Sequence, residues 1–174
     1  MAELRFALLA HTEVPGAKDH LDLLVEVRPG EDPEERACLT LRRDGLGPLA
    51  ALESEELVDP TQPAVRLVRT RDHRRFYLGH EGPVAGGRGR VERREGGVWL
   101  PKSLLDEYLE GVFDNGFRPV YLRLHRLAAS AALQAEAAAG EIASMASAAA
   151  VPPQVPAAVP VAASDAWILA RLDV

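Results

Sequence analysis

The stretch HLDLLVE, residues 20–26, constrains the fold more than any other part of the sequence. Side chains alternate between the two faces of a β-strand, and the pattern here alternates in the same way. One face would hold His20, Asp22, Leu24 and Glu26. The other face would hold Leu21, Leu23, Val25 and Val27. We therefore predict a strand with its second face against a core.

The polar face of this strand has two interpretations. An imidazole and a carboxylate two residues apart on a rigid strand can hold a divalent metal ion. The same pair is also compatible with a solvent-facing edge of a sheet. Because His-x-Asp patterns are common, His20 and Asp22 taken alone favour the second interpretation.

Other segments predict a mainly β fold. Further strands are expected at residues 4–11, 36–43, 64–70, 118–127 and 165–174. A Ser-x-x-Asp capping box and an apolar stripe predict a helix at residues 103–112, and Glu95 to Gly97 predict a hairpin turn. The expected fold is a small antiparallel β-barrel with one or two short helices. An Ala/Pro-rich excursion precedes its last strand.

This excursion sets the expected domain boundaries. Residues 128–164 are rich in alanine and proline and are predicted to be a low-complexity insertion or linker. The apolar segment that follows it suggests that the chain returns to the sheet. The barrel is therefore expected to comprise residues 1–127 plus 165–174.

Composition narrows the setting of the protein. The chain has 174 residues, of which 47% are hydrophobic, enough for a core. It has no apolar run long enough to cross a membrane and no evident signal peptide, so no membrane partner is expected. Cys38 is the single cysteine, which excludes an intrachain disulfide and favours the cytoplasm.

Charge is distributed unevenly along the chain. The net charge is −6, but residues 66–94 contain nine arginines and three acidic residues. Residues 31–59 contain nine acidic residues and three arginines. A local basic segment can still meet phosphate, because surface charges are screened over roughly 8 Å. It is equally compatible with a solvated arginine-rich face.

Several motifs also occur in a characteristic order. They are RFALLAH and HLDLLVE near the start, then DHRRFYLGHEG and GGRGRV, then GVWLP, and finally WILAR. In this order the chain resembles the 3′-phosphoesterase domain of bacterial DNA ligase D, as a divergent, stand-alone member. The resemblance covers roughly residues 4–127 and 165–174.

The resemblance implies a function and a site. It implies a metal-dependent hydrolase of DNA-repair type that acts on 3′-phosphorylated or 3′-ribonucleotide ends of nucleic acids. His11, His20 and Asp22 would bind Mn²⁺, with Zn²⁺ or another divalent ion as an alternative. Catalytic contacts to phosphate would come from His73, Tyr77, and Arg66 or Arg69. A DNA-repair ligase or polymerase is the candidate protein partner.

One departure from the family pattern opens an alternative function. The family's phosphate-gripping arginine is Leu24 here, and an aliphatic side chain has no hydrogen-bond donor. Arg66 or Arg69 is a candidate to compensate for the missing arginine. Arg42 or Arg43 is a candidate to replace a second basic residue of the family, which follows its third strand. Without compensation the chain would be a catalytically degenerate barrel that binds nucleic-acid ends or a protein partner. A purely structural β-domain is the third alternative.

Overall fold

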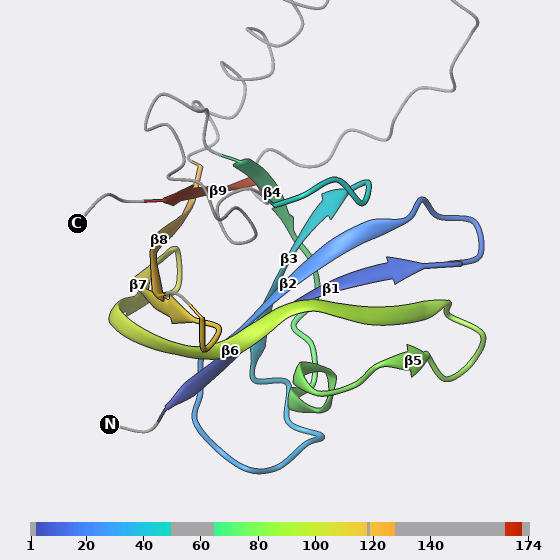
Figure 1. Cartoon of the computed structure of the whole chain (residues 1–174), viewed down its shortest axis with the longest axis horizontal. Coiled ribbons are helices and arrows are strands. Elements are labelled where there is room, and N and C mark those ends of the chain that lie inside the picture. The colour runs from blue at the N-terminus through green and yellow to red at the C-terminus, as the bar shows by residue number, and fades with distance from the viewer. Residues whose placement is uncertain (1–2, 50–64, 118, 128–165, 172–174) are drawn as a thin grey trace, which may run out of the picture.

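The structure is a computed structural model that describes residues 3–49, 65–117, 119–127 and 166–171. These residues form nine strands and one short 3₁₀ helix (Figure 1). The strands are β1 (Leu4–Thr12), β2 (His20–Glu26), β3 (Cys38–Asp44), β4 (Val65–Arg69), β5 (Gly82–Pro83), β6 (Arg90–Leu105), β7 (Tyr108–Asp114), β8 (Pro119–Arg126) and β9 (Ala166–Arg171). The 3₁₀ helix, η1, spans Arg75–Leu78.

Eight of the strands close into an antiparallel barrel. The order around the barrel is β1-β2-β3-β4-β9-β8-β7-β6, and β6 pairs again with β1. The two-residue β5 pairs with Arg90 and Val91 at the start of β6. Closure removes the unpaired strand edges that would otherwise promote aggregation. The predicted mainly β barrel is confirmed.

The last strand completes this barrel. β9 lies between β4 and β8 and pairs antiparallel with both. Trp167 of β9 is fully buried, which explains why so apolar a segment follows the Ala/Pro-rich sequence. The predicted Ala/Pro-rich excursion, residues 128–164, lies outside the described residues.

The core lies inside the barrel. It includes Leu21, Leu23, Val25, Leu41, Trp99, Phe113, Leu122 and Trp167. The apolar face predicted for β2 is therefore confirmed. Burial of each large apolar side chain contributes about 1.5–3 kcal/mol, so this cluster is the main stabilising feature. The described residues include no helix long and apolar enough to span a membrane.

The helix predicted at residues 103–112 is wrong, because this segment contains the turn between β6 and β7. Leu105 pairs with Tyr108, and β7 pairs with β8 along its whole length. The apolar stripe is not a buried helix face, since Leu104 and Leu105 are exposed. Pairing with distant strands overrides the local capping pattern. The described residues contain no α-helix.

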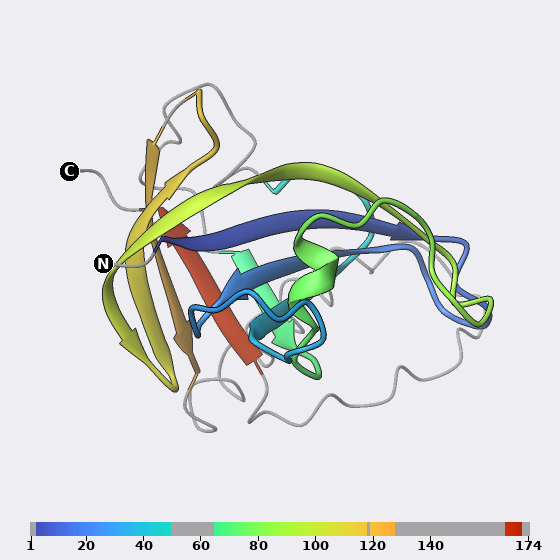
Figure 2. The ribbon, with the colours of Figure 1, turned by 90° about the horizontal axis from the view of Figure 1, so that it is seen from below.

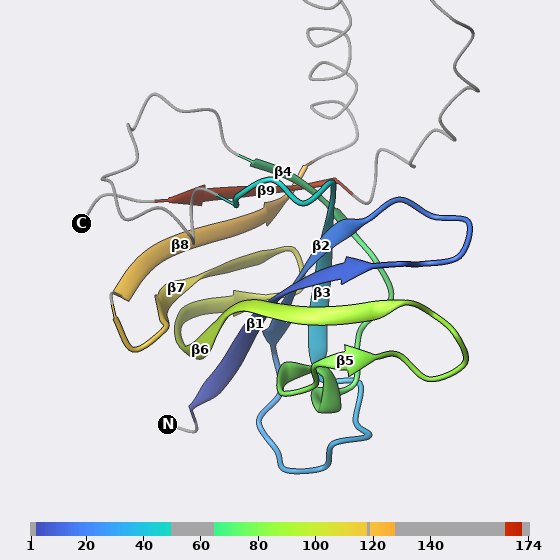
Figure 3. The ribbon, with the colours of Figure 1, turned by 45° about the vertical axis from the view of Figure 1, so that its right-hand side comes forward.

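The hairpin turn predicted at Glu95 to Gly97 is also wrong. β6 continues through these residues as one long, curved strand, as Figure 3 shows. Its first part pairs with β1 and its last part pairs with β7. The glycines permit close approach of neighbouring strands instead. A Cβ atom on Gly97 would lie 2.1 Å from the carbonyl oxygen of Asp114.

Candidate metal centre

Two histidines and one aspartate converge on the outer face of the barrel wall. His11 at the end of β1 pairs directly with His20 at the start of β2, and their ring centroids lie 4.8 Å apart. Asp22 lies two residues further along β2, hence on the same face. One potential ligand atom from each residue lies within 4.8 Å of the other two. We call these three residues the metal cluster, and they can hold one metal ion.

The metal cluster is buried. His20 and Asp22 are each 2% exposed, and the His11 side chain is 15% exposed. The solvent-facing alternative for His20 and Asp22 is therefore wrong. η1 lies against this outer face beside β1, as Figure 2 shows, and an apolar layer continues from the cluster. That layer consists of Ala7, Leu9, Leu24, Cys38 and Leu78, with Tyr77 packed against it.

Backbone carbonyls fix the orientation of both imidazole rings. The Nε2 atom of His11 lies 2.8 Å from the carbonyl oxygen of Arg88, and Nδ1 of His20 lies 2.8 Å from that of Lys18. A carbonyl oxygen only accepts, so each of these nitrogens carries its proton. In the neutral ring, the other nitrogen then has a free lone pair. A histidine that binds a metal through one ring nitrogen usually donates a hydrogen bond from the other nitrogen in this way.

The two remaining nitrogens face the same carboxylate oxygen. His20 Nε2 lies 3.3 Å from Asp22 Oδ2, and His11 Nδ1 lies 3.7 Å from it. His20 Nε2 is buried and has no hydrogen-bond partner among the described residues. A buried nitrogen without a partner is costly, and a cation shared with the carboxylate would remove that cost. The residues present therefore fit a metal ion.

Asp22 also contacts Arg42 on the neighbouring strand β3. The Nε atom of Arg42 donates to Asp22 Oδ1 at 3.1 Å. Burial alone would raise the pKa of Asp22, but its contacts with His11, His20 and Arg42 hold this pKa well below its ordinary value. The carboxylate is therefore ionised at neutral pH, as a metal ligand requires.

The donor set restricts the kind of metal. Two imidazole nitrogens and one carboxylate oxygen suit borderline divalent ions such as Mn²⁺ and Zn²⁺. Three protein ligands leave coordination positions for water or substrate. The geometry of the metal cluster supports a divalent ion without selecting between these metals.

His73 lies in the connection between β4 and η1, beside the start of β3. Its backbone exchanges two hydrogen bonds with Cys38, and its Nδ1 donates to the carbonyl oxygen of Arg71 at 2.9 Å. Burial lowers the pKa of His73, while the Asp22 carboxylate acts in the opposite direction. The Tyr77 ring packs against His73 with a centroid separation of 5.5 Å. His73 and Tyr77 therefore form one unit next to the metal cluster.

The strand register separates the two candidate arginines of β4. Val68 pairs with Arg42, so Arg66 shares the face of the barrel wall that holds Asp22. Arg69 is on the opposite face and donates to Asp72 at 3.0 Å. There it lines a cavity of about 750 Å³ at the end of the barrel. Of the two, only Arg66 lies on the face of the metal cluster.

Arg42 is in direct contact with the metal cluster, through its ion pair with Asp22. The sequence identified it only as one of two candidates for a family position. Its neighbour Arg43 is on the other face and donates to the carbonyl oxygen of Pro48 at 2.8 Å. The signal that separates them is alternation: Arg42 and Asp22 are directly opposite each other in the β2–β3 pair.

Leu24, which replaces the family's arginine, is fully buried in the apolar layer under η1. The position is filled by packing and lies next to Asp22 on the same face of β2. The cationic groups nearest to the metal cluster therefore come from other strands.

Comparisons with known proteins leave the family open. No protein-family model matches the chain, and no curated protein matches it. The resemblance to the phosphoesterase domain of DNA ligase D thus remains an interpretation of the ordered motifs. The metal cluster stands independently of it, because it follows from register, burial and ring orientation.

Proposed function

We propose that this chain is a metal-dependent phosphoesterase that acts on 3′-phosphorylated or 3′-ribonucleotide ends of nucleic acids, in DNA repair. The observation that supports this most is the buried metal cluster of His11, His20 and Asp22, with its ligand atoms oriented toward one another. The segment with nine arginines, residues 66–94, adds positive charge to an otherwise acidic chain.

The residues around the metal cluster have complementary roles in this proposal. A bound divalent ion would polarise a phosphoryl oxygen or lower the pKa of a coordinated water. The carbonyls of Lys18 and Arg88 keep both imidazoles in the ligand tautomer. Arg42, which holds Asp22 in place, and Arg66 supply positive charge on the same face.

In this proposal His73 and Tyr77 contact the phosphate group of the substrate and the attacking water. Because Nδ1 of His73 donates to Arg71, its Nε2 is the nitrogen left for substrate. Burial lowers the pKa of His73, so the neutral ring accepts a proton from the attacking water at neutral pH. The hydroxyl of Tyr77, in contact with Arg74 at 3.4 Å, donates to a phosphate oxygen.

A second candidate function is favoured by Leu24. Because this position is closed by apolar packing, the site lacks the bidentate guanidinium donor that the family pattern has there. On this account the barrel binds phosphorylated ends, or a DNA-repair ligase or polymerase, without hydrolysis. Binding to DNA ends that persists while phosphate release is undetectable would select this function.

The test of the proposed activity is phosphate release from a 3′-phosphorylated primer–template in the presence of Mn²⁺. We expect release by the wild-type protein and loss of at least about 100-fold for Asp22→Asn and His20→Gln. His125→Gln, on β8 and outside the metal cluster, is the control and should retain the wild-type rate. No release with Mn²⁺, Zn²⁺ or other divalent ions would contradict the enzymatic proposal.

A further inference from the structure

Two stacked aromatic rings, Phe76 and His80, lie at the surface beside the candidate site. Phe76 of η1 and His80 stack with a centroid separation of 4.7 Å and an angle of 30° between their planes. Phe76 is 42% exposed, although it is an aromatic residue on a short, well-packed element. These two residues are called the aromatic platform below.

The aromatic platform is connected to the residues proposed to contact phosphate. Tyr77 packs edge-on against Phe76 at 5.3 Å and against His80 at 5.8 Å between centroids. The same ring contacts His73 at 5.5 Å. One intervening ring, that of Tyr77, therefore separates Phe76 from His73.

The aromatic platform is held rigidly. The backbone N–H of Phe76 donates to the carbonyl oxygen of Pro33 at 2.8 Å. The next residue back, Arg75, is buried and forms an ion pair with Glu26 and another with Glu35 at 2.9 Å. Exposure of the Phe76 ring is therefore a property of a fixed surface, and a ligand would not have to order it first.

Positive charge lies against these rings. The guanidinium carbon of Arg74 is 5.8 Å from the Phe76 ring centroid and 5.4 Å from that of Tyr77. Aromatic faces combined with arginine are the usual way to hold unpaired bases without sequence preference. Arg74 also pairs with Glu34, and exchange of this carboxylate for a phosphate of the bound strand would keep the guanidinium charge compensated.

We propose that the aromatic platform stacks an unpaired nucleobase near the 3′ end of the substrate strand. This inference rests on the proposed function, and it predicts a preference for strand ends whose last bases are unpaired. The base stacks on the side of the Phe76 ring away from His80, and the phosphate of the same strand end lies toward His73 and the metal cluster.

The test compares two short, fluorescently labelled, 3′-phosphorylated single strands that differ only at their last two sugars. One strand has bases there, and the other is abasic. Fluorescence anisotropy should show that the wild-type protein binds the base-containing strand about 5- to 100-fold more tightly. Phe76→Ala should bind both strands equally, and Phe76→Trp should restore the preference.

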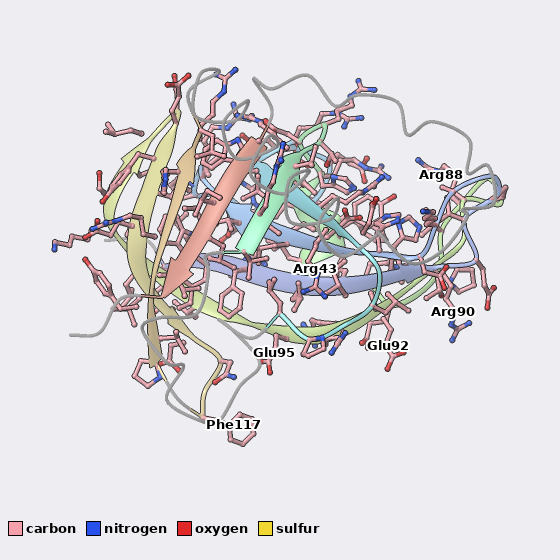
Figure 4. All side chains as sticks on the ribbon, turned by 90° about the horizontal axis from the view of Figure 1, so that it is seen from above. Arg43, Arg88, Arg90, Glu92, Glu95 and Phe117 are labelled. Atoms are coloured by element: carbon pink, nitrogen blue, oxygen red, sulfur yellow. The ribbon has the colours of Figure 1, made fainter. Side chains whose placement is uncertain are left out.

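Phe117→Ala is the matched control. Phe117 is 96% exposed, on a different element between β7 and β8, and projects from the edge of the barrel in Figure 4. Its removal should leave the preference for bases unchanged. The inference is overturned if the wild-type protein binds both strands equally, or if Phe76→Ala retains the preference.

Failure of this inference is distinguishable from failure of the proposed function. Phosphate release from the abasic strand reports the catalytic residues without base stacking, and the control Phe117→Ala should retain it at the wild-type rate. If no variant releases phosphate from either strand, the proposed activity fails, while the anisotropy ratio still decides the role of Phe76. If phosphate is released from both strands with equal binding, the proposed activity stands and stacking on Phe76 is wrong.

Discussion

The Nε2 atom of His20 lies 3.3 Å from Oδ2 of Asp22 yet makes no hydrogen bond within the described part of the chain. The other nitrogen of the ring is occupied by the carbonyl oxygen of Lys18. A nitrogen lone pair and a carboxylate oxygen that face each other in a buried site require a proton or a cation between them. This relationship is the physical basis of the metal proposal.

Substitution of Gly111 tests the packing of β6 against β7. A Cβ atom at this position would lie 2.3 Å from the carbonyl oxygen of Leu100, so the strands would have to separate. Gly111→Ala should lower the free energy of unfolding by about 2 kcal/mol or more in urea denaturation. Gly79→Ala is the control, because Gly79 has φ of −118° and no heavy atom would lie within 4 Å of its Cβ. Equal stability of the two variants would contradict this description of the β6–β7 contact.

Arg75 is expected to fix η1 to the barrel. It donates to the carboxylates of Glu26 and Glu35 and to the carbonyl oxygens of Asp32 at 2.6 Å and Arg28 at 2.8 Å. Arg75→Met leaves a buried carboxylate without one of its cations. It should therefore lower the free energy of unfolding by about 3 kcal/mol or more.

The control for Arg75 is Arg71→Met, which changes an exposed arginine in the connection between β4 and η1. Its free energy of unfolding should stay within about 0.5 kcal/mol of the wild type. Thermal unfolding followed by circular dichroism measures both variants. If Arg71→Met lowered the free energy of unfolding as much as Arg75→Met, the buried contacts of Arg75 would have no special role in stability.

Glu110 on β7 is expected to make stability depend on acid pH. It accepts hydrogen bonds from the hydroxyls of Tyr108 and Tyr121 and pairs with Lys102 at 3.2 Å and Arg123 at 3.4 Å. The hydrogen bonds from Tyr108 and Tyr121 are the main causes that lower the pKa of Glu110 from its ordinary value of 4.5 to about 2. The ionised carboxylate therefore stabilises the folded chain above the ordinary pKa. This stabilisation is lost as the pH falls toward 2.

Glu110→Gln should be less stable than the wild type at about pH 7, and the difference should shrink at about pH 3. Urea denaturation at both pH values measures it. Glu92, labelled in Figure 4, is an exposed residue on β6. The variant Glu92→Gln should have the same free energy of unfolding as the wild type at both pH values. A difference for Glu110→Gln that grows on acidification would contradict this account.

Cys38 should be unreactive in the folded protein. The residue is fully buried at the start of β3, and burial, with a smaller effect from Glu26, raises the pKa of its thiol to about 12. Only the thiolate reacts, so labelling by a thiol-reactive dye at neutral pH should require unfolding. Labelling in buffer as fast as in concentrated urea would show that the Cys38 side of β3 opens readily.

The sequence predicted the strands well where alternation is strong, and it placed His20 and Asp22 on one face of β2. The helix predicted at residues 103–112 failed because local capping and spacing contain no information on the pairing of β7 with β8. The two arginines of β4 show the same limit. Which of Arg66 and Arg69 faces the metal cluster depends on the register between β3 and β4, which are twenty residues apart in the sequence (45–64).

The contact between Arg42 and Asp22 could not be predicted for a related reason. It depends on the register of β2 and β3 across an intervening loop of eleven residues, 27–37, whose conformation the sequence does not fix. The convergence of His11 with His20 required only a hairpin with its ends in register. The ordered motifs already suggested that arrangement.

The most direct test of the central claim is a calorimetric titration of the metal-free protein with Mn²⁺ and Zn²⁺. The account predicts that one ion binds per chain and that binding raises the melting temperature. Binding should be abolished by His20→Gln and Asp22→Asn and retained by His125→Gln. If the folded wild-type protein binds neither ion stoichiometrically, or if His20→Gln binds as well as the wild type, His11, His20 and Asp22 are not a metal centre.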